Sequence, residues 1–167
     1  VLIPEKNQLW ISNGKKSWCE SRDGTYLKTD LLQNKRIIHD MTIVTSKNHR
    51  NQTLKKVIEK LNFKDQIVMG SVGCKIASIL RGESNIYICL SLPGKSSPKD
   101  WDFAAPEAIL KTAGGSLTNL NNDELSYGGS NFEQGGIIVA TSDKFSHKSI
   151  CSEIMQVIRK FDLYPFD

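Results

Sequence analysis

The residue of this chain best placed to do chemistry is a carboxylate at the start of a predicted helix. Residues 101–115 read Trp-Asp-Phe-Ala-Ala-Pro-Glu-Ala-Ile-Leu-Lys-Thr-Ala-Gly-Gly, a spacing that predicts a helix ending at the glycine pair. Asp102 lies in its first turn, where unpaired peptide N–H groups gather and where a hard metal ion and a phosphate can meet. A plain helix cap explains the same position, and the residues alone favour the cap.

The predicted helix runs from Trp101 to Ala113 and carries a stripe of small residues that we expect to pack into the core. The stripe consists of Ala104, Ala105, Ala108, Ile109 and Thr112. Glu107 and Lys111 are predicted to form an i,i+4 pair on another face. Pro106 belongs near the first turn, where a missing N–H costs least, and Gly114 ends the helix.

A second candidate lies upstream, where Gly70-Ser71-Val72-Gly73 joins a predicted strand to a predicted helix. Backbone N–H groups at such a junction can approach a phosphate or a nucleotide hydroxyl. Ser71 also suits a plain N-cap, and Lys75, one turn later, suits an exposed helix lysine. Without further information these plainer interpretations are favoured.

Together these segments resemble a known family. The pattern W-D-x-A-A-x-x-x-I-x-x-x-A-G-G resembles the second signature of the inositol monophosphatase family, magnesium-dependent phosphatases that include the 3'(2'),5'-bisphosphate nucleotidases. Residues 70–77 and 81–87 resemble the stretch upstream of that signature, and 135–141 its closing strand. The Lys75 spacing and the Ser-Leu-Pro before Trp101 lean toward the bacterial nucleotidase branch, which acts on 3'-phosphoadenosine 5'-phosphate.

The resemblance implies roles for named residues. It implies a Mg²⁺ cofactor with Asp102 as one ligand, no catalytic residue beyond that ligand, and attack on a phosphate monoester by metal-activated water. Ser71 and Lys75 become substrate contacts. His49 resembles the Ser-x-x-His beside the nucleotidase pocket, although it reads equally as a loop histidine. Lys95 suits a second phosphate, with a solvated loop lysine as the alternative.

The sequence also departs from the family. The Gly-Glu-Glu and Asp-Pro-x-Asp-Gly-Thr segments that chiefly build the family's metal site are not in this chain, and Arg22-Asp23-Gly24-Thr25 reads as a hairpin turn. Cys89 stands where nucleotidase members tend to carry Arg, which weakens the assignment of 3'-phosphoadenosine 5'-phosphate. We therefore expect the C-terminal part of a longer enzyme, inactive in isolation. An inositol monophosphatase or a noncatalytic phosphometabolite-binding remnant are the alternatives.

The elements that must position these residues alternate after an opening β meander. Asn13-Gly14 predicts a hairpin between 9–12 and 17–20, and the meander ends near Lys28. Strands are predicted at 43–46, 66–69, 85–90, 116–120 and 136–141, and helices at 52–61, 71–81, 101–113 and 146–161. The class is α/β, and the resemblance implies the layered sugar-phosphatase fold with mixed sheets and packed helices. Residues 1–40 would be a remnant of an N-terminal antiparallel sheet and 41–167 a C-terminal α/β domain.

Composition fits a globular protein and narrows its partners. Of the residues, 39% are hydrophobic and 24% charged, and the net charge of +4 includes no basic stripe interleaved with aromatics, which argues against binding a nucleic-acid polymer. No apolar run approaches membrane-spanning length. Four cysteines without a C-x-x-C spacing suggest reduced thiols and, with the resemblance, a cytoplasmic location. The expected partner is a small phosphorylated metabolite, and uncovered sheet edges leave room for a homodimer.

Overall fold

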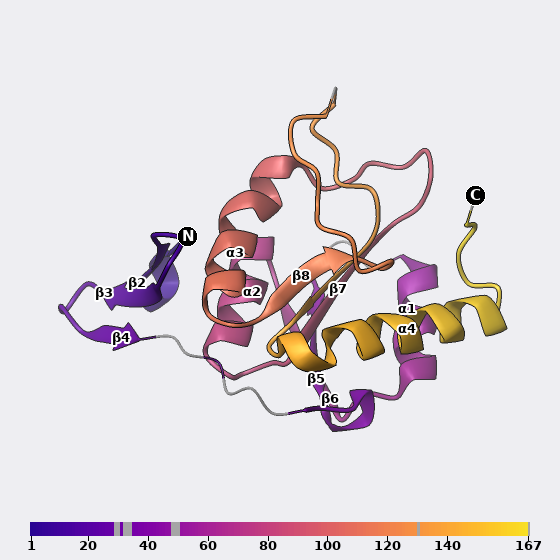
Figure 1. Cartoon of the computed structure of the whole chain (residues 1–167), viewed down its shortest axis with the longest axis horizontal. Helices are drawn as coiled ribbons and strands as arrows, with labels where there is room; N and C mark the ends of the chain where they lie inside the picture. Colours follow the sequence, from indigo (N-terminus) through magenta and orange to yellow (C-terminus); the bar gives the residue numbers. More distant parts are fainter. Residues whose placement is uncertain (29–30, 32–34, 48–50, 130, 167) are drawn as a thin grey trace.

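The computed structural model of the 167-residue chain describes residues 1–28, 31, 35–47, 51–129 and 131–166. Its elements form four layers: an antiparallel sheet, helices α2 and α3, a five-stranded mixed sheet, and helices α1 and α4. Figure 1 shows the antiparallel sheet at the left with α2 and α3 beside it, and α4 running along the bottom toward the right. The predicted α/β class is confirmed.

The first layer is a meander of β1 (Leu2–Ile3), β2 (Gln8–Ser12), β3 (Ser17–Ser21) and β4 (Tyr26–Lys28). β2 and β3 pair antiparallel around Asn13 and Gly14, as predicted, and Gly14 takes the positive φ of 82° that the turn needs. Asp23 lies in the next turn and accepts hydrogen bonds from the Ser21 hydroxyl and from the amide of Thr25. The turn interpretation of residues 22–25 is therefore confirmed.

The third layer is a sheet with the strand order β6-β5-β7-β9-β8. Its strands are β5 (Thr42–Ser46), β6 (Asp65–Met69), β7 (Ile86–Ser91), β8 (Ser116–Asn119) and β9 (Gly136–Thr141). β5 pairs parallel with β6 and β7, whereas β9 pairs antiparallel with β7 and β8. The parallel strands end together near Ser46, Met69 and Ser91, which creates one edge for a binding site.

Within the described residues, four α-helices cover the two faces of this sheet. They are α1 (Gln52–Leu61), α2 (Val72–Leu80), α3 (Asp100–Thr112) and α4 (Lys144–Lys160). One hydrophobic core lies where α2 and α3 separate the two sheets and includes Trp10, Ile76 and Phe103. A second core lies under α1 and α4 and includes Leu54 and Ile154. Each helix thus buries an apolar face, and for α1 it is the predicted face with Leu54, Val57 and Leu61.

The buried face of α3 differs from the prediction. Ala104, Ala105 and Ala108 are exposed, so the expected core stripe is wrong for the alanines, whereas Ile109 is buried as predicted. The rest of the buried face consists of Phe103, Pro106, Glu107 and Leu110. Phe103 and Leu110 remove more apolar surface from water than alanine does, which explains why they are buried in place of the alanines. Pro106 lies in the interior of the helix rather than near its first turn.

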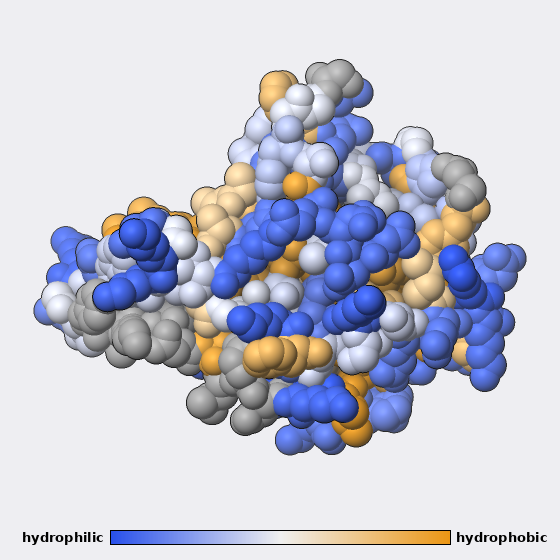
Figure 2. All heavy atoms as spheres, in the orientation of Figure 1, coloured by the Kyte–Doolittle hydropathy of each residue, from blue (hydrophilic) through white to orange (hydrophobic). Residues whose placement is uncertain are grey.

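The surface in the view of Figure 2 is largely hydrophilic, with hydrophobic side chains in small groups. In the described part of the chain no helix is long and apolar enough to cross a bilayer. The four cysteines are unpaired; Cys19 and Cys151 are buried, and Cys74 and Cys89 are half-buried. The division into an N-terminal remnant and a C-terminal domain at residue 40 stays a prediction.

Candidate functional site

A pocket of about 730 Å³ lies where the parallel strands of the mixed sheet end. Its wall comes from the ends of β5 and β7, the starts of α1, α2 and α3, and the loop that follows β7. Among the predicted site residues it brings together Ser71, Lys75, Lys95 and Asp102, which come from three separate parts of the sequence. His49 lies outside the described residues.

Lys75 is the buried cationic residue of the pocket wall. Its side chain is only 3% exposed, so the alternative of an exposed helix lysine is wrong. The ammonium donates a hydrogen bond to the carbonyl of Gly70 at 2.5 Å and lies 5.0 Å from the centre of the Tyr87 ring. Burial lowers the pKa of Lys75, while the nearby Cys89, Cys74 and Asp102 oppose that shift.

The Lys75 ammonium retains capacity for a ligand. It has three N–H donors, and within the described residues only the Gly70 carbonyl accepts one of them. A buried cation with unused donors that faces a cavity favours an anion there, because the anion restores part of the lost solvation.

Asp102 forms the cap considered for it, and its role as a metal ligand stays a prediction. Its Oδ2 accepts a hydrogen bond from the backbone N–H of Lys99 at 2.9 Å, while the Asp102 N–H donates to the Lys99 carbonyl. The cap interpretation thus accounts for one carboxylate oxygen. The other oxygen, Oδ1, has no hydrogen-bond partner among the described residues, and the half-buried side chain lines the pocket.

Three helices begin at the pocket, and their caps fix its wall. The side chain of Asn51 accepts from the amide of Leu54 at the start of α1 and donates to the carbonyl of Leu90 at the end of β7. Ser71 caps α2 by accepting from the amide of Cys74, so its plain interpretation as an N-cap is confirmed. The positive ends of these helix dipoles add to the field of Lys75 and favour a negatively charged ligand.

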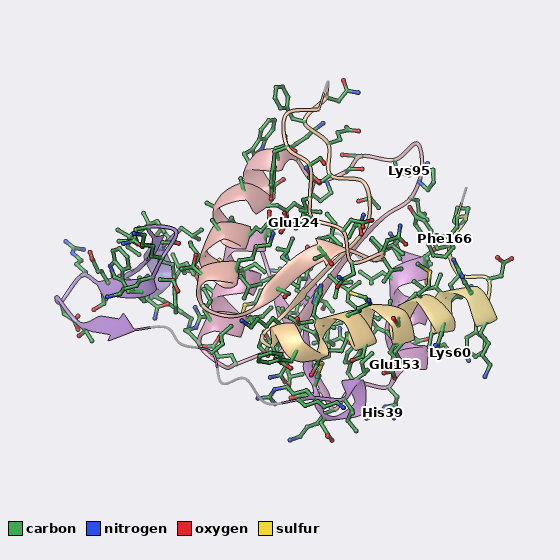
Figure 3. All side chains as sticks on the ribbon, in the orientation of Figure 1. His39, Lys60, Lys95, Glu124, Glu153 and Phe166 are labelled. Atoms are coloured by element: carbon green, nitrogen blue, oxygen red, sulfur yellow. The ribbon has the colours of Figure 1, made fainter. Side chains whose placement is uncertain are left out.

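The loop after β7 carries Lys95, an exposed side chain that lines the pocket from the outer side. Figure 3 shows Lys95 on this loop, on the side of the molecule where α1 begins. Lys47, at the end of β5, lines the same pocket. Three lysines and one aspartate therefore face the cavity, which makes it suited to a ligand with more than one negative charge.

Sequence reasoning missed part of this wall, including Lys47, Asn51 and Ser91. Asn51 had a local signal, because an asparagine before the apolar spacing of residues 52–61 is typical of a helix cap. Nothing local indicated its second hydrogen bond to Leu90, 39 residues away. Lys47 had no signal of its own.

A complete magnesium site is not formed by the described residues. In the parts of the chain that the structure describes, no group of three or more His, Cys, Asp or Glu side chains could hold a metal ion. The only carboxylate in the pocket wall of those parts is that of Asp102. Magnesium requires nearly octahedral oxygen coordination, and one free carboxylate oxygen falls well short of it.

Comparisons with known proteins bear on this geometry. The profile described as the inositol monophosphatase family matches residues 1–159. A curated relative, 3'(2'),5'-bisphosphate nucleotidase 1 of Mus musculus, is 35% identical over 85 residues, which are 51% of this chain and 26% of that protein. The chain thus spans well under two thirds of this relative.

Solved structures show the same fold. CysQ from Bacteroides thetaiotaomicron, a bacterial member of that family, superimposes with a TM-score of 0.66 at 20% identity over 85% of this chain and 56% of the other. The staphylococcal protein SaIMPase-II with bound inositol monophosphate gives a TM-score of 0.60 at 17% identity over 87% and 55% of the two chains. These similarities confirm the expected layered α/β fold.

Proposed function

Since this chain belongs to the inositol monophosphatase family, we propose that its pocket binds the phosphate groups of a small phosphorylated metabolite as part of a phosphatase site. The observation that carries the proposal is the buried Lys75, which lines the pocket together with Asp102 and whose ammonium has one hydrogen-bond acceptor among the described residues. Three helix N-termini converge on the same cavity and add favourable dipoles.

The proposed substrate is 3'-phosphoadenosine 5'-phosphate, which would be hydrolysed to AMP. The lysine excess of the pocket supports two phosphates, since Lys75 and Lys95 lie at different depths. The nucleotidase named among the relatives supports the same substrate class. Inositol 1-phosphate is the competing substrate, because SaIMPase-II shares this fold and binds inositol monophosphate.

We further propose that hydrolysis depends on Mg²⁺ and needs ligands besides Asp102. The described residues place a single carboxylate in the pocket, so this 167-residue chain should bind its ligand and turn it over slowly or not at all. A cytoplasmic location and a homodimer remain part of the proposal.

The test uses the purified 167-residue chain. Calorimetric titration with 3'-phosphoadenosine 5'-phosphate, AMP and inositol 1-phosphate should show the bisphosphate binding at least about tenfold more tightly than AMP, since an added phosphate makes charge-assisted hydrogen bonds. Phosphate release from each compound with Mg²⁺ should stay near background.

Three results would contradict parts of this proposal. Equal affinity for AMP and the bisphosphate would remove the second phosphate from the assignment, and tighter binding of inositol 1-phosphate would favour an inositol monophosphatase. Rapid phosphate release would show that the chain needs no further metal ligands.

A further inference from the structure

The first turn of α3 is tied to a distant loop by a buried carboxylate outside the pocket wall. Asp100 is 9% exposed, and both of its oxygens accept hydrogen bonds. Oδ2 accepts from the amide of Gly128 and Oδ1 from the side-chain amide of Gln134, each at 2.6 Å. Both donors belong to residues 120–135, which connect β8 to β9.

Backbone hydrogen bonds strengthen this connection. The amide of Asp100 donates to the carbonyl of Phe132, and the amide of Gln134 donates to the carbonyl of Pro98, both at 2.8 Å. Lys99 forms an ion pair with Glu133 at 2.7 Å. Residues 98–100 and 131–134 therefore lie side by side, at the end of the molecule where the loop rises beside the start of α3 in Figure 1.

The side chain of Gln134 is fixed by its hydrogen bonds. It is 6% exposed, and its side-chain amide donates both to Asp100 and to the carbonyl of Ser126 at 2.7 Å. Its two N–H groups are thus both used. A buried carboxylate and a buried amide that satisfy each other hold one geometry, because any displacement leaves a polar group unpaired.

Asp102 lies two residues after Asp100 in the same helical turn. Its Oδ2 accepts a hydrogen bond from the amide of Lys99. The two neighbours of Lys99 in the chain, Pro98 and Asp100, each form a backbone hydrogen bond to the β8–β9 connection. The direction of the Asp102 carboxylate therefore depends on the path of residues 98–100. The hydrogen bonds from Gly128 and Gln134 to the Asp100 carboxylate hold that path, together with the backbone hydrogen bonds to Phe132 and Gln134.

We infer that Asp100 is a positioning residue, which directs Oδ1 of Asp102 into the pocket by tying Gly128 and Gln134 to the start of α3. This inference rests on the proposed function, since it concerns the same phosphate pocket. The proposed ligand is an anion that binds near Lys75. When no divalent cation is present, the negative charge of Asp102 repels this anion.

The experiment is a double-mutant cycle on affinity for 3'-phosphoadenosine 5'-phosphate, measured in the full 167-residue chain with a metal chelator. Asp102→Asn should tighten binding by about threefold to tenfold, because it removes a negative charge from the wall. In the Asp100→Ala background the same change should alter affinity by less than about twofold. Asp100→Asn, which keeps an acceptor for Gly128, should recover part of the effect.

Glu107 provides the matched control. It is a buried acid on the same helix that ties the same loop, through the hydroxyl of Tyr127, and it also pairs with Lys111 at 2.6 Å. It lies more than one turn beyond Asp102. Glu107→Gln should therefore leave the Asp102→Asn effect at its full size. A role limited to folding would make both backgrounds behave alike.

Hydrogen exchange provides a second measurement that needs no ligand. The amide of Lys99, which donates to Asp102, should exchange at least about tenfold faster in Asp100→Ala or Gln134→Ala than in Glu107→Gln. Gln134→Ala serves if Asp100→Ala does not fold. An unchanged Asp102→Asn effect together with unchanged Lys99 exchange would overturn the inference. If no variant binds the bisphosphate, the proposed function fails and the exchange measurement decides the positioning role alone.

Discussion

Two buried ionisable side chains, Lys75 in the pocket and His147 on α4, differ in how far the protein satisfies their hydrogen-bonding groups. Both are almost fully buried, and burial lowers the pKa of each. The two ring nitrogens of His147 lie 2.8 Å from the hydroxyls of Thr118 and Thr141, so its hydrogen-bonding capacity is filled within the fold. Among the residues that the structure describes, the Lys75 ammonium has one acceptor, the Gly70 carbonyl, and Lys75 lines the pocket.

The difference separates a structural group from a binding group. A buried polar side chain with every partner supplied by the protein gains nothing from a ligand. A buried cation with unused N–H donors has lost hydrogen bonds to water, and a bound anion can replace them. Burial or a shifted pKa alone would have given both residues the same role.

The largest expected effect concerns the pH dependence of stability through His147. Its pKa falls from 6.5 to about 4 in the folded protein, chiefly because burial disfavours the charged ring, while Asp143 partly opposes this. The unfolded chain binds a proton here below about pH 6.5, whereas the folded chain does so only near pH 4. The contribution of the neutral His147 to the free energy of unfolding is therefore fully present above pH 6.5. It decreases by about 3 kcal/mol as the pH falls toward 4.

Urea unfolding at a series of pH values measures this effect as the difference between the original chain and His147→Gln. The difference should shrink steadily below pH 6.5, and ligand affinity at pH 7.5 should stay within about twofold. His39 is the matched control, because it is exposed and its one hydrogen bond within the described residues joins Nδ1 to the Asn62 carbonyl. A constant difference from pH 7.5 to 4 would show that His147 is not kept neutral by the fold.

The next effect is on binding. Lys75→Met removes the ammonium while keeping an unbranched side chain in the buried space, and should weaken 3'-phosphoadenosine 5'-phosphate binding by about tenfold to a hundredfold. Because a buried charge is lost as well, the free energy of unfolding should change by less than about 1 kcal/mol. Calorimetric titration measures the change in affinity, and urea unfolding of the same sample measures the change in stability. Large destabilisation with normal affinity would make Lys75 a structural residue like His147.

Much of the fold followed from local pattern. The hairpin at Asn13 and Gly14 and all four helices have sequence signals that operate within a few residues. The insertion of β9 between β7 and β8 has no such signal, since it depends on packing between distant segments. The misassigned face of α3 has the same origin. Glu107 is buried because Tyr127 and Lys111 satisfy its carboxylate, and Tyr127 is 20 residues away.

The site divides in a similar way. Ser71, Lys75, Lys95 and Asp102 were identified from sequence, and the structure brings all four into one pocket, while their roles stay predictions. The depth of Lys75 could not be predicted, because its burial results from the packing of α2 against the sheet and Tyr87. Local spacing shows which residues share a neighbourhood; the unused hydrogen-bonding capacity of a side chain depends on the whole fold.

The smallest expected effect is that of Lys95, an exposed lysine of the same pocket. Lys95 lines the pocket but is exposed, so water and salt screen its charge far more than that of Lys75. Lys95→Met should weaken bisphosphate binding by about twofold to fivefold at low salt, and the loss should nearly vanish at about 0.5 M NaCl, where the Debye length is short. Lys75→Met should retain most of its effect there. If salt reduced both effects equally, the burial of Lys75 would not be what distinguishes it from Lys95.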